Sequence, residues 1–367
     1  MSTINRVLSV LCAVFGSLLA LMVFYYIVAF TEIPGIRELR DTWVETAMTT
    51  ADHQWLAERF FPQTVIDNIM SKQVTTDGIV TAPDATINVK HDDKPTNTDN
   101  GKVNDSGNAI SISNPVEEIT IKPGDKDELG NKILIYDKAQ DIKIVEISGL
   151  SFKGRLLFVT DPSRVVVRHT SKKDAAGDFL SVYLNDYDGI AAINGNGFAD
   201  ENGVGSGGQI LGWSMADGKM WGSKLPGAAS AGFTKDNVLV VGSIDKPDSY
   251  NIRDMVQWGP ALIANGDKLV SGSAGWGLHP RTAIGQTSDG TVILATVDGR
   301  QPEHSIGITV GELSDILYDY GCVNASLCDG GSSTVMMYDG EIIGSPSTPM
   351  KTTGRHLPNA IIVLKKQ

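Results

Sequence analysis

The chain begins with an unbroken run of apolar positions. Residues 7–30, VLSVLCAVFGSLLALMVFYYIVAF, carry no charged side chain. As an α-helix rising about 1.5 Å per residue they would reach roughly 36 Å, which exceeds a hydrocarbon core of about 30 Å. The pattern predicts a transmembrane anchor over residues 1–31. A cleaved signal peptide is the competing interpretation, but the run is longer than a usual signal core and no clear small-x-small cleavage site follows it.

Apolar positions then recur at helical spacing over residues 32–74. This pattern predicts a juxtamembrane amphipathic helix that ends near Pro62 and a second, short helix after it. The apolar stripe over residues 40–70 suits either self-association or a plain stalk. Its members are Trp43, Ala47, Met48, Ala51, Trp55, Leu56 and Phe60 in the first helix, and Val65, Ile66, Ile69 and Met70 in the second.

Large apolar residues become sparse over residues 75–129, where Asp, Asn, Thr, Gly and Pro dominate. Such a segment buries too little apolar surface to offset the entropy lost on ordering. We therefore expect a flexible linker, from which the following domain hangs away from the membrane.

Short β-rich runs alternate with turn signals over residues 130–367. Residues 281–300 are typical of a hairpin, because TSDG lies between two β-branched runs. The convincing helix covers residues 309–320, with Thr309 as N-cap, Glu312 completing a capping box and Gly321 ending it. The predicted fold class is α+β: a mixed, β-rich single domain with few helices, preceded by an N-terminal transmembrane helix.

Composition and charge limit the classes of partner that the protein can bind. The net charge of −12 argues against nucleic acid, because no basic field exists to displace counterions. Cys322 and Cys328 form either two buried thiols or one short bridge, and no CxxC motif or histidine cluster indicates zinc. We expect no metal and no cofactor. Arginines flank the apolar run on both sides and leave its orientation open, but the polar, glycine-rich bulk is typical of an exported domain.

The stretch LCDGGSST, residues 327–334, is the first candidate for chemistry. It delivers Asp329 to the end of a predicted strand, and Gly330 and Gly331 let backbone N–H groups approach a ligand. Three hydroxyl side chains follow at the same place. No lysine follows the glycines, which excludes a P-loop, and an ordinary tight turn is the alternative interpretation.

Polar or charged side chains also lie at the ends of three further predicted strands. Arg281 lies at a strand start, where a guanidinium can hold a phosphate bidentately. Asp298 and Arg300 flank a turn at the far end of the same hairpin, and a surface ion pair is the alternative for Arg300. Asn194 and Gly195 end another strand, where the amide is available for a sugar hydroxyl or simply terminates the strand.

Together, AAINGNGF, PALIANGDKLVSG, RTAIGQTSDGTVILATVDGR, GITVGELSDIL, LCDGGSSTVMMYDGEII and LPNAIIV resemble, in order and spacing, the phosphodiester glycosidase family. The resemblance covers roughly residues 130–367. It implies hydrolysis of a sugar-1-phosphodiester, such as an N-acetylglucosamine-1-phosphodiester, at the sugar C1–O bond, with release of free sugar and a phosphomonoester. The implied partner is a phosphate-linked glycan. From the predicted anchor and the composition we expect a single-pass protein of the cell membrane with its catalytic domain outside the cytoplasm. Because the anchor would place that domain beside the cell envelope, we expect a role in cell-envelope or exopolysaccharide metabolism.

Under this resemblance Asp329 and Asp298 are the candidate catalytic carboxylates, and Arg281 is the candidate group that stabilises the charge of the departing phosphate. A membrane-tethered carbohydrate-binding or scaffold protein is the alternative function. An esterase using Ser332 or Ser333 is disfavoured, since no G-x-S-x-G motif occurs. The predicted substrate-binding residues are Asn194, Gly195, Thr282, Arg300, Gly330, Gly331, Ser332, Ser333 and Thr334.

Overall fold

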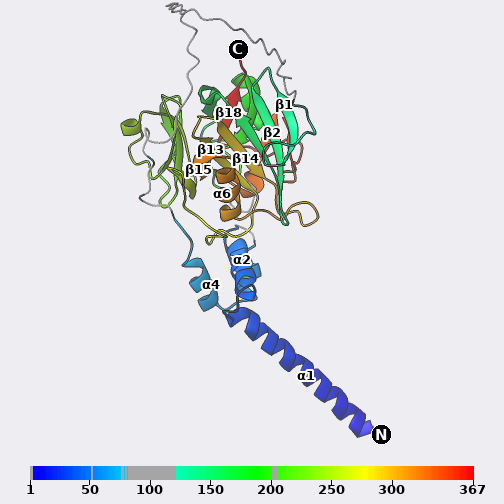
Figure 1. Ribbon diagram of the computed structural model, residues 1–367. Helices are drawn as coiled ribbons and strands as arrows, with labels where there is room; N and C mark the ends of the chain where they lie inside the picture. Colours follow the sequence, from blue (N-terminus) through cyan, green and yellow to red (C-terminus); the bar gives the residue numbers. More distant parts are fainter. Residues whose placement is uncertain (1–2, 51–52, 76–77, 79–80, 82–120, 201–204) are drawn as a thin grey trace, which may run out of the picture.

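The computed structural model describes residues 3–50, 53–75, 78, 81, 121–200 and 205–367. A β-rich domain lies at the end of a series of helices, and the N-terminus lies at the far tip of the first helix (Figure 1). The α+β prediction is confirmed. Most of the predicted linker lies outside the described residues, so its flexibility and the domain boundaries stay predictions.

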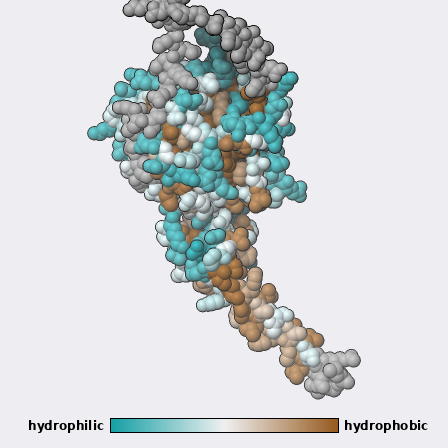
Figure 2. Space-filling view, in the orientation of Figure 1, coloured by the Kyte–Doolittle hydropathy of each residue, from teal (hydrophilic) through white to brown (hydrophobic). Residues whose placement is uncertain are grey.

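Helix α1 spans Thr3–Phe30 and projects away from the rest of the molecule (Figure 1). Its Leu8–Phe30 portion has a mean hydropathy of 2.3 and is largely exposed, although Ala29 near its end is buried, and its surface is predominantly hydrophobic (Figure 2). By length and composition it meets the requirement for crossing a membrane, a requirement that an N-terminal signal sequence also meets.

Three short helices connect α1 to the domain, and their apolar faces meet in one small core. The single helix expected up to Pro62 is instead two helices. The Thr49 and Thr50 hydroxyls donate to the carbonyls of Glu45 and Ala47 and so compete with continued helical bonding. The helices are α2 (Ile36–Met48), α3 (Trp55–Glu58) and α4 (Gln63–Met70), and the core is Val44, Ala47, Ala57, Ile66 and Ile69. Self-association through residues 40–70 stays a prediction.

All paired strands of the domain run antiparallel, in three sheets. The first sheet has the order β1 (Lys132–Asp137), β2 (Ile142–Ser148), β3 (Lys153–Val159), β14 (Val292–Val297), β13 (Arg281–Thr287), β15 (Cys322–Leu327), β11 (Ala261–Ala264) and β12 (Asp267–Lys268). The second has the order β7 (Lys219–Trp221), β6 (Ser214–Ala216), β10 (Ile252–Gln257), β8 (Ser230–Thr234) and β9 (Leu239–Gly242). The third has the order β17 (Glu341–Ile342), β16 (Met336–Tyr338), β5 (Gly189–Asn194), β18 (Asn359–Leu364) and β4 (Val165–His169).

One apolar core joins the three sheets. Ile144 comes from the first sheet, Val241 from the second and Ile193 from the third. A second core lies under α6 (Val310–Asp319), which packs Leu313 and Leu317 against the first sheet. Strands β14 and β5 are buried along their whole length, which explains their nearly continuous apolar sequences. The described residues also form α5 (Leu180–Asp186) and the 3₁₀ turns Pro162–Arg164, Pro247–Tyr250 and Gly331–Ser333.

Two local predictions are confirmed. The 281–300 hairpin pairs Arg281 with Val297 and Gln286 with Val292. Helix α6 begins with the predicted capping box, in which Thr309 Oγ1 accepts from the Glu312 N–H and the Glu312 carboxylate accepts from the Thr309 N–H.

The sheet order brings the candidate loops to one place. Strand β15 pairs with β13, so the turn that follows Leu327 lies beside the start of β13 at Arg281. The end of β5 comes to the same turn, because the Asp329 N–H donates to the Gly195 carbonyl. These contacts position the site.

Candidate functional site

The Asp329 turn is fixed through its backbone. The Asp329 N–H donates to the Gly195 carbonyl at 2.8 Å, and the Gly331 N–H donates to the Pro280 carbonyl at 3.0 Å. A Cβ at position 195 would lie 2.5 Å from Oδ1 of Asn359, so this position is packed for glycine. The turn therefore joins the ends of β5 and β15 to the start of β13.

Two fully buried side chains, Asn194 and Thr282, fix the position of the turn. Asn194 Nδ2 donates to the Asp329 carbonyl at 2.6 Å, and its Oδ1 accepts from the Thr282 hydroxyl at 2.7 Å and from the Val335 N–H at 3.2 Å. The hydrogen-bonding capacity of the Asn194 amide is thus used largely within the protein. Sugar or phosphate contact by Asn194 and Thr282 stays a prediction.

The two glycines of the turn have little space around them. A Cβ at Gly330 would lie 2.7 Å from the Pro280 carbonyl oxygen. Gly331 has φ 60°, and a Cβ there would lie 3.1 Å from Nη2 of Arg300. The turn consequently presents backbone, with the Arg300 guanidinium directly beside it.

The three hydroxyl side chains after the glycines have different surroundings. Ser332 Oγ accepts from Nη1 of Arg355 at 2.9 Å. Ser333 hydrogen-bonds the Asp329 carboxylate. Thr334 Oγ1 is buried and has no hydrogen-bond partner within the described part of the chain.

Asp329 itself is partly buried, and its surroundings control its protonation. Burial raises its pKa to about 6, because the charged form is poorly solvated there. The Ser333 hydrogen bond, the charges of Arg355 and Arg300, and the Gly330 backbone each lower the pKa and limit the rise. A carboxyl group with a pKa in this range suits proton transfer near neutral pH.

Arg355 was not singled out from the sequence. It is 9% exposed, forms a 2.6 Å ion pair with Asp200, and lies 4.7 Å from the Phe198 ring centroid. It precedes β18, the neighbour of β5 in the sheet. An arginine just before that strand was the available signal, but the strand pairing that gives it meaning is not visible in the sequence.

The Arg281 guanidinium is hydrogen-bonded to the loop that precedes its own strand. Thr282, the next residue on β13, faces Asn194, and successive side chains alternate between faces of a strand. The Arg281 Nη2 donates to the carbonyls of Trp276 and Gly277 at 2.7 and 3.1 Å, while its Nε lacks a partner among the described residues. Burial and the nearby Arg300 lower its pKa to about 9. Among the described residues, no hydrogen bond or ion pair joins it to Asp329, and its role as phosphate ligand stays a prediction.

Asp298 is 5% exposed, and both of its oxygens are occupied. Its Oδ2 accepts from Arg155 Nη1 at 2.5 Å and lies 2.8 Å from His304 Nε2. Its Oδ1 accepts from the Ser345 N–H at 3.1 Å. The charge of this carboxylate is balanced by the Arg155 guanidinium, and the role of Asp298 as second catalytic group stays a prediction.

Cys322 and Cys328 are buried free thiols. Burial raises the pKa of both thiols, so neither suits a thiolate nucleophile at neutral pH. Within the described residues, no group of three or more His, Cys, Asp or Glu side chains could hold a metal ion.

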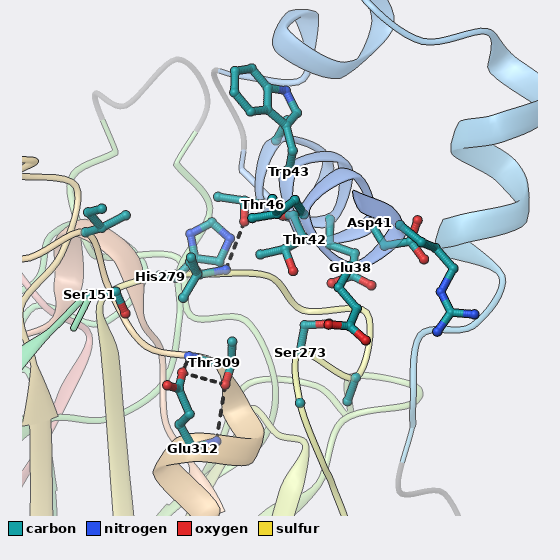
Figure 3. Close-up of a pocket in the computed structure, with 18 of the residues that line it drawn as sticks. Glu38, Asp41, Thr42, Trp43, Thr46, Ser151, Ser273, His279, Thr309 and Glu312 are labelled. Atoms are coloured by element: carbon teal, nitrogen blue, oxygen red, sulfur yellow. Dashed lines mark hydrogen bonds between the residues drawn. The ribbon is translucent and has the colours of Figure 1, made fainter. Parts of the chain in front are cut away.

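A cleft of about 1550 Å³ lies between α2 and the domain. Figure 3 shows Thr42 and Thr46 of α2 on one side, with His279 beside them and Thr309 and Glu312 of α6 across the cleft. Arg300 also lines the cleft, and therefore lies between it and the Asp329 turn.

In comparison with known proteins, residues 187–364 match the phosphodiester glycosidase family model. A 171-residue stretch is 30% identical to the SPbeta prophage-derived uncharacterized protein YomE of Bacillus subtilis (strain 168), covering 43% of this chain and 26% of the relative. The chain thus spans about a quarter of that relative's length. A similar solved structure is the catalytic domain of zebrafish N-acetylglucosamine-1-phosphodiester alpha-N-acetylglucosaminidase, auto-inhibited by its pro-peptide, with TM-score 0.50, 22% identity, and coverage of 61% of this chain and 82% of that chain.

Proposed function

Because residues 187–364 match the phosphodiester glycosidase family model, we propose that this protein hydrolyses a sugar-1-phosphodiester to free sugar and a phosphomonoester. The observation that carries the proposal is a carboxyl group with a raised pKa, Asp329, beside two arginines, Arg300 and Arg355. An anionic leaving group and an anomeric carbon need this combination of charges.

In the proposed mechanism, the phosphate leaves as a weak base, so stabilising its charge matters more than protonating it. We assign that role to Arg300, whose guanidinium lies beside Gly331, with Arg355 supporting the turn through Ser332. Asp329 supports the oxocarbenium-like sugar and either activates water or acts as the nucleophile. Arg281 stays a candidate phosphate ligand because its buried Nε lacks a partner in the described chain.

The other predicted residues receive positioning roles. Asn194 holds the Asp329 carbonyl, and the Thr282 hydroxyl holds the Asn194 amide. Asp298 links Arg155, His304 and the Ser345 backbone, and we assign it to holding these loops together.

The test is release of reducing sugar from N-acetylglucosamine 1-(methyl phosphate) by the full-length chain in detergent. Asp329→Asn should lower the rate by about 10³-fold or more, in line with the loss of a catalytic carboxylate. Asp319→Asn, at an exposed position on α6, is the matched control and should retain the wild-type rate. Binding without release in the wild type would favour the carbohydrate-binding alternative, and labelling of Ser332 or Ser333 by a fluorophosphonate would favour an esterase.

We also propose a location at a membrane, with the domain outside the cytoplasm and a phosphate-linked glycan of the cell envelope or exopolysaccharide as substrate. The apolar α1 supports the membrane part of this proposal. Protease digestion of intact cells, followed by detection of the domain, tests it: protection of the domain from external protease would contradict the location.

A further inference from the structure

Helix α2 holds the loop that precedes β13, residues 271–280. A hydrogen bond of 2.7 Å joins Thr49 Oγ1 to His279 Nε2, and the Leu278 N–H donates to Thr46 Oγ1 at 2.9 Å. The Glu45 carboxylate also lies near Ser273 and Gly277 of this loop. The loop therefore has specific polar contacts with a helix more than 200 residues earlier in the chain.

The two surfaces also approach closely through glycines. A Cβ at Gly277 would lie 2.5 Å from the Thr46 backbone nitrogen, and a Cβ at Gly275 would lie 2.4 Å from Cα of Gln73, just after α4. Beside them, the Val74 N–H donates to the Ala274 carbonyl at 2.9 Å. The loop is shaped to fit the helices.

The same loop carries parts of the candidate site. Its Trp276 and Gly277 carbonyls accept from the Arg281 guanidinium. At its end, the Pro280 carbonyl accepts from the Gly331 N–H of the Asp329 turn. A continuous series of contacts thus runs from α2 through residues 277–280 to Asp329.

From this series we propose that the helices between residues 36 and 74 complete the active site, with Thr46 and Thr49 as positioning residues that fix the 271–280 loop and, through it, the Asp329 turn. The inference rests on the proposed function. It assigns a catalytic contribution to a segment that lies outside the 187–364 family match. Neither threonine touches the turn directly; each acts through the loop.

The experiment uses the full-length chain in detergent with N-acetylglucosamine 1-(methyl phosphate). Thr49→Val and the Thr46→Val/Thr49→Val pair should lower kcat by about 10-fold or more while KM changes by less than about 2-fold, because small misplacements of catalytic groups are costly. Thr49→Ser, which keeps the hydroxyl, should restore kcat. Thr42→Val is the matched control: it lies on the same helix and lines the cleft, but no described hydrogen bond of its side chain reaches the loop.

Amide hydrogen exchange supplies a second readout, independent of turnover. The valine variants should exchange faster over residues 274–281 and at wild-type rates in β14. Wild-type kcat in the double variant would overturn the inference, and so would an increase in kcat, which would give the helices a blocking role. Inactivity of the wild type on the diester would instead overturn the proposed function.

Discussion

At the residue scale, Asp329 is retained at a position that disfavours its charge. Its folded-state pKa is raised to about 6 from an ordinary value of 3.8. The folded protein therefore binds this proton more tightly than the unfolded chain does, and the stability associated with it is present below about pH 4 and lost as pH rises through 6. A structural role alone would not require an acid here, whereas a proton-transfer role would.

The first prediction follows from that sign. Asp329→Asn should raise the free energy of unfolding by about 1–3 kcal/mol at pH 7.5, since the neutral amide removes the buried charge. At pH 4, where the aspartic acid is mostly protonated in the folded protein, the gain should largely disappear. Thermal unfolding of the domain at both pH values measures it. An equal gain at both would show that the charge of Asp329 is not the cause.

Arg355 sets the second prediction, on pH dependence. Its charge lowers the pKa of Asp329, so Arg355→Gln should move the acid limb of the kcat profile above its wild-type position near pH 6. Arg355→Lys keeps a positive charge and should shift the limb less. A pH–rate profile of the three proteins decides this, and a limb displaced toward lower pH in the glutamine variant would contradict the assignment.

Asp329, its glycines and Arg300 could be proposed from the sequence because local turn chemistry marks them, and their roles stay predictions. The sequence did not identify Arg355, whose proximity depends on β18 pairing with β5. It also could not show that the Arg281 guanidinium hydrogen-bonds the loop at Trp276, because strand alternation is readable only once the neighbours on each face are known.

At the element scale, the features that were predicted correctly have local causes. The 281–300 hairpin follows from its turn, and α6 from its capping box. The order of the strands within the first sheet could not be predicted, because β15 lies between β13 and β11, strands that are separated from it along the chain. At the end of α2 the Thr49 and Thr50 hydroxyls bond backbone carbonyls. Nothing in the sequence distinguishes these two threonines from others in the chain, so the break between α2 and α3 could not be predicted.

The third prediction concerns α6. Thr309→Ala removes the N-cap acceptor of the Glu312 N–H and should cost about 1 kcal/mol of stability, while Thr309→Ser should cost much less. Urea denaturation measures both. kcat below the transition should match the wild type, because no described contact joins Thr309 to the Asp329 turn; a large loss of kcat in the alanine variant would give this residue a further role.

At the scale of the whole molecule, the helices and the β-rich domain form one unit up to α1. Arg40, 5% exposed, donates to the carbonyls of Ala29 and Thr31, so α2 also holds the end of α1. The described ends of the predicted linker are bonded as well: the Thr81 N–H donates to the Val241 carbonyl, and the Ile133 N–H donates to the Asp125 carbonyl. The domain is thus tied to its stalk by contacts that a reading based on composition could not reveal.

Two truncations separate anchoring from catalysis. A chain beginning at residue 29 keeps both carbonyls that accept from Arg40. It should leave the detergent phase in a Triton X-114 partition, because the exposed apolar length of α1 is gone, and should retain kcat within about 2-fold. A chain beginning at residue 75 lacks Thr46 and Thr49 and should lose kcat by about 10-fold or more even where its thermal unfolding remains cooperative. Full activity of the shorter chain would show that the β-rich domain works without its helices, and detergent partition of the longer one would show that α1 is not what binds the membrane.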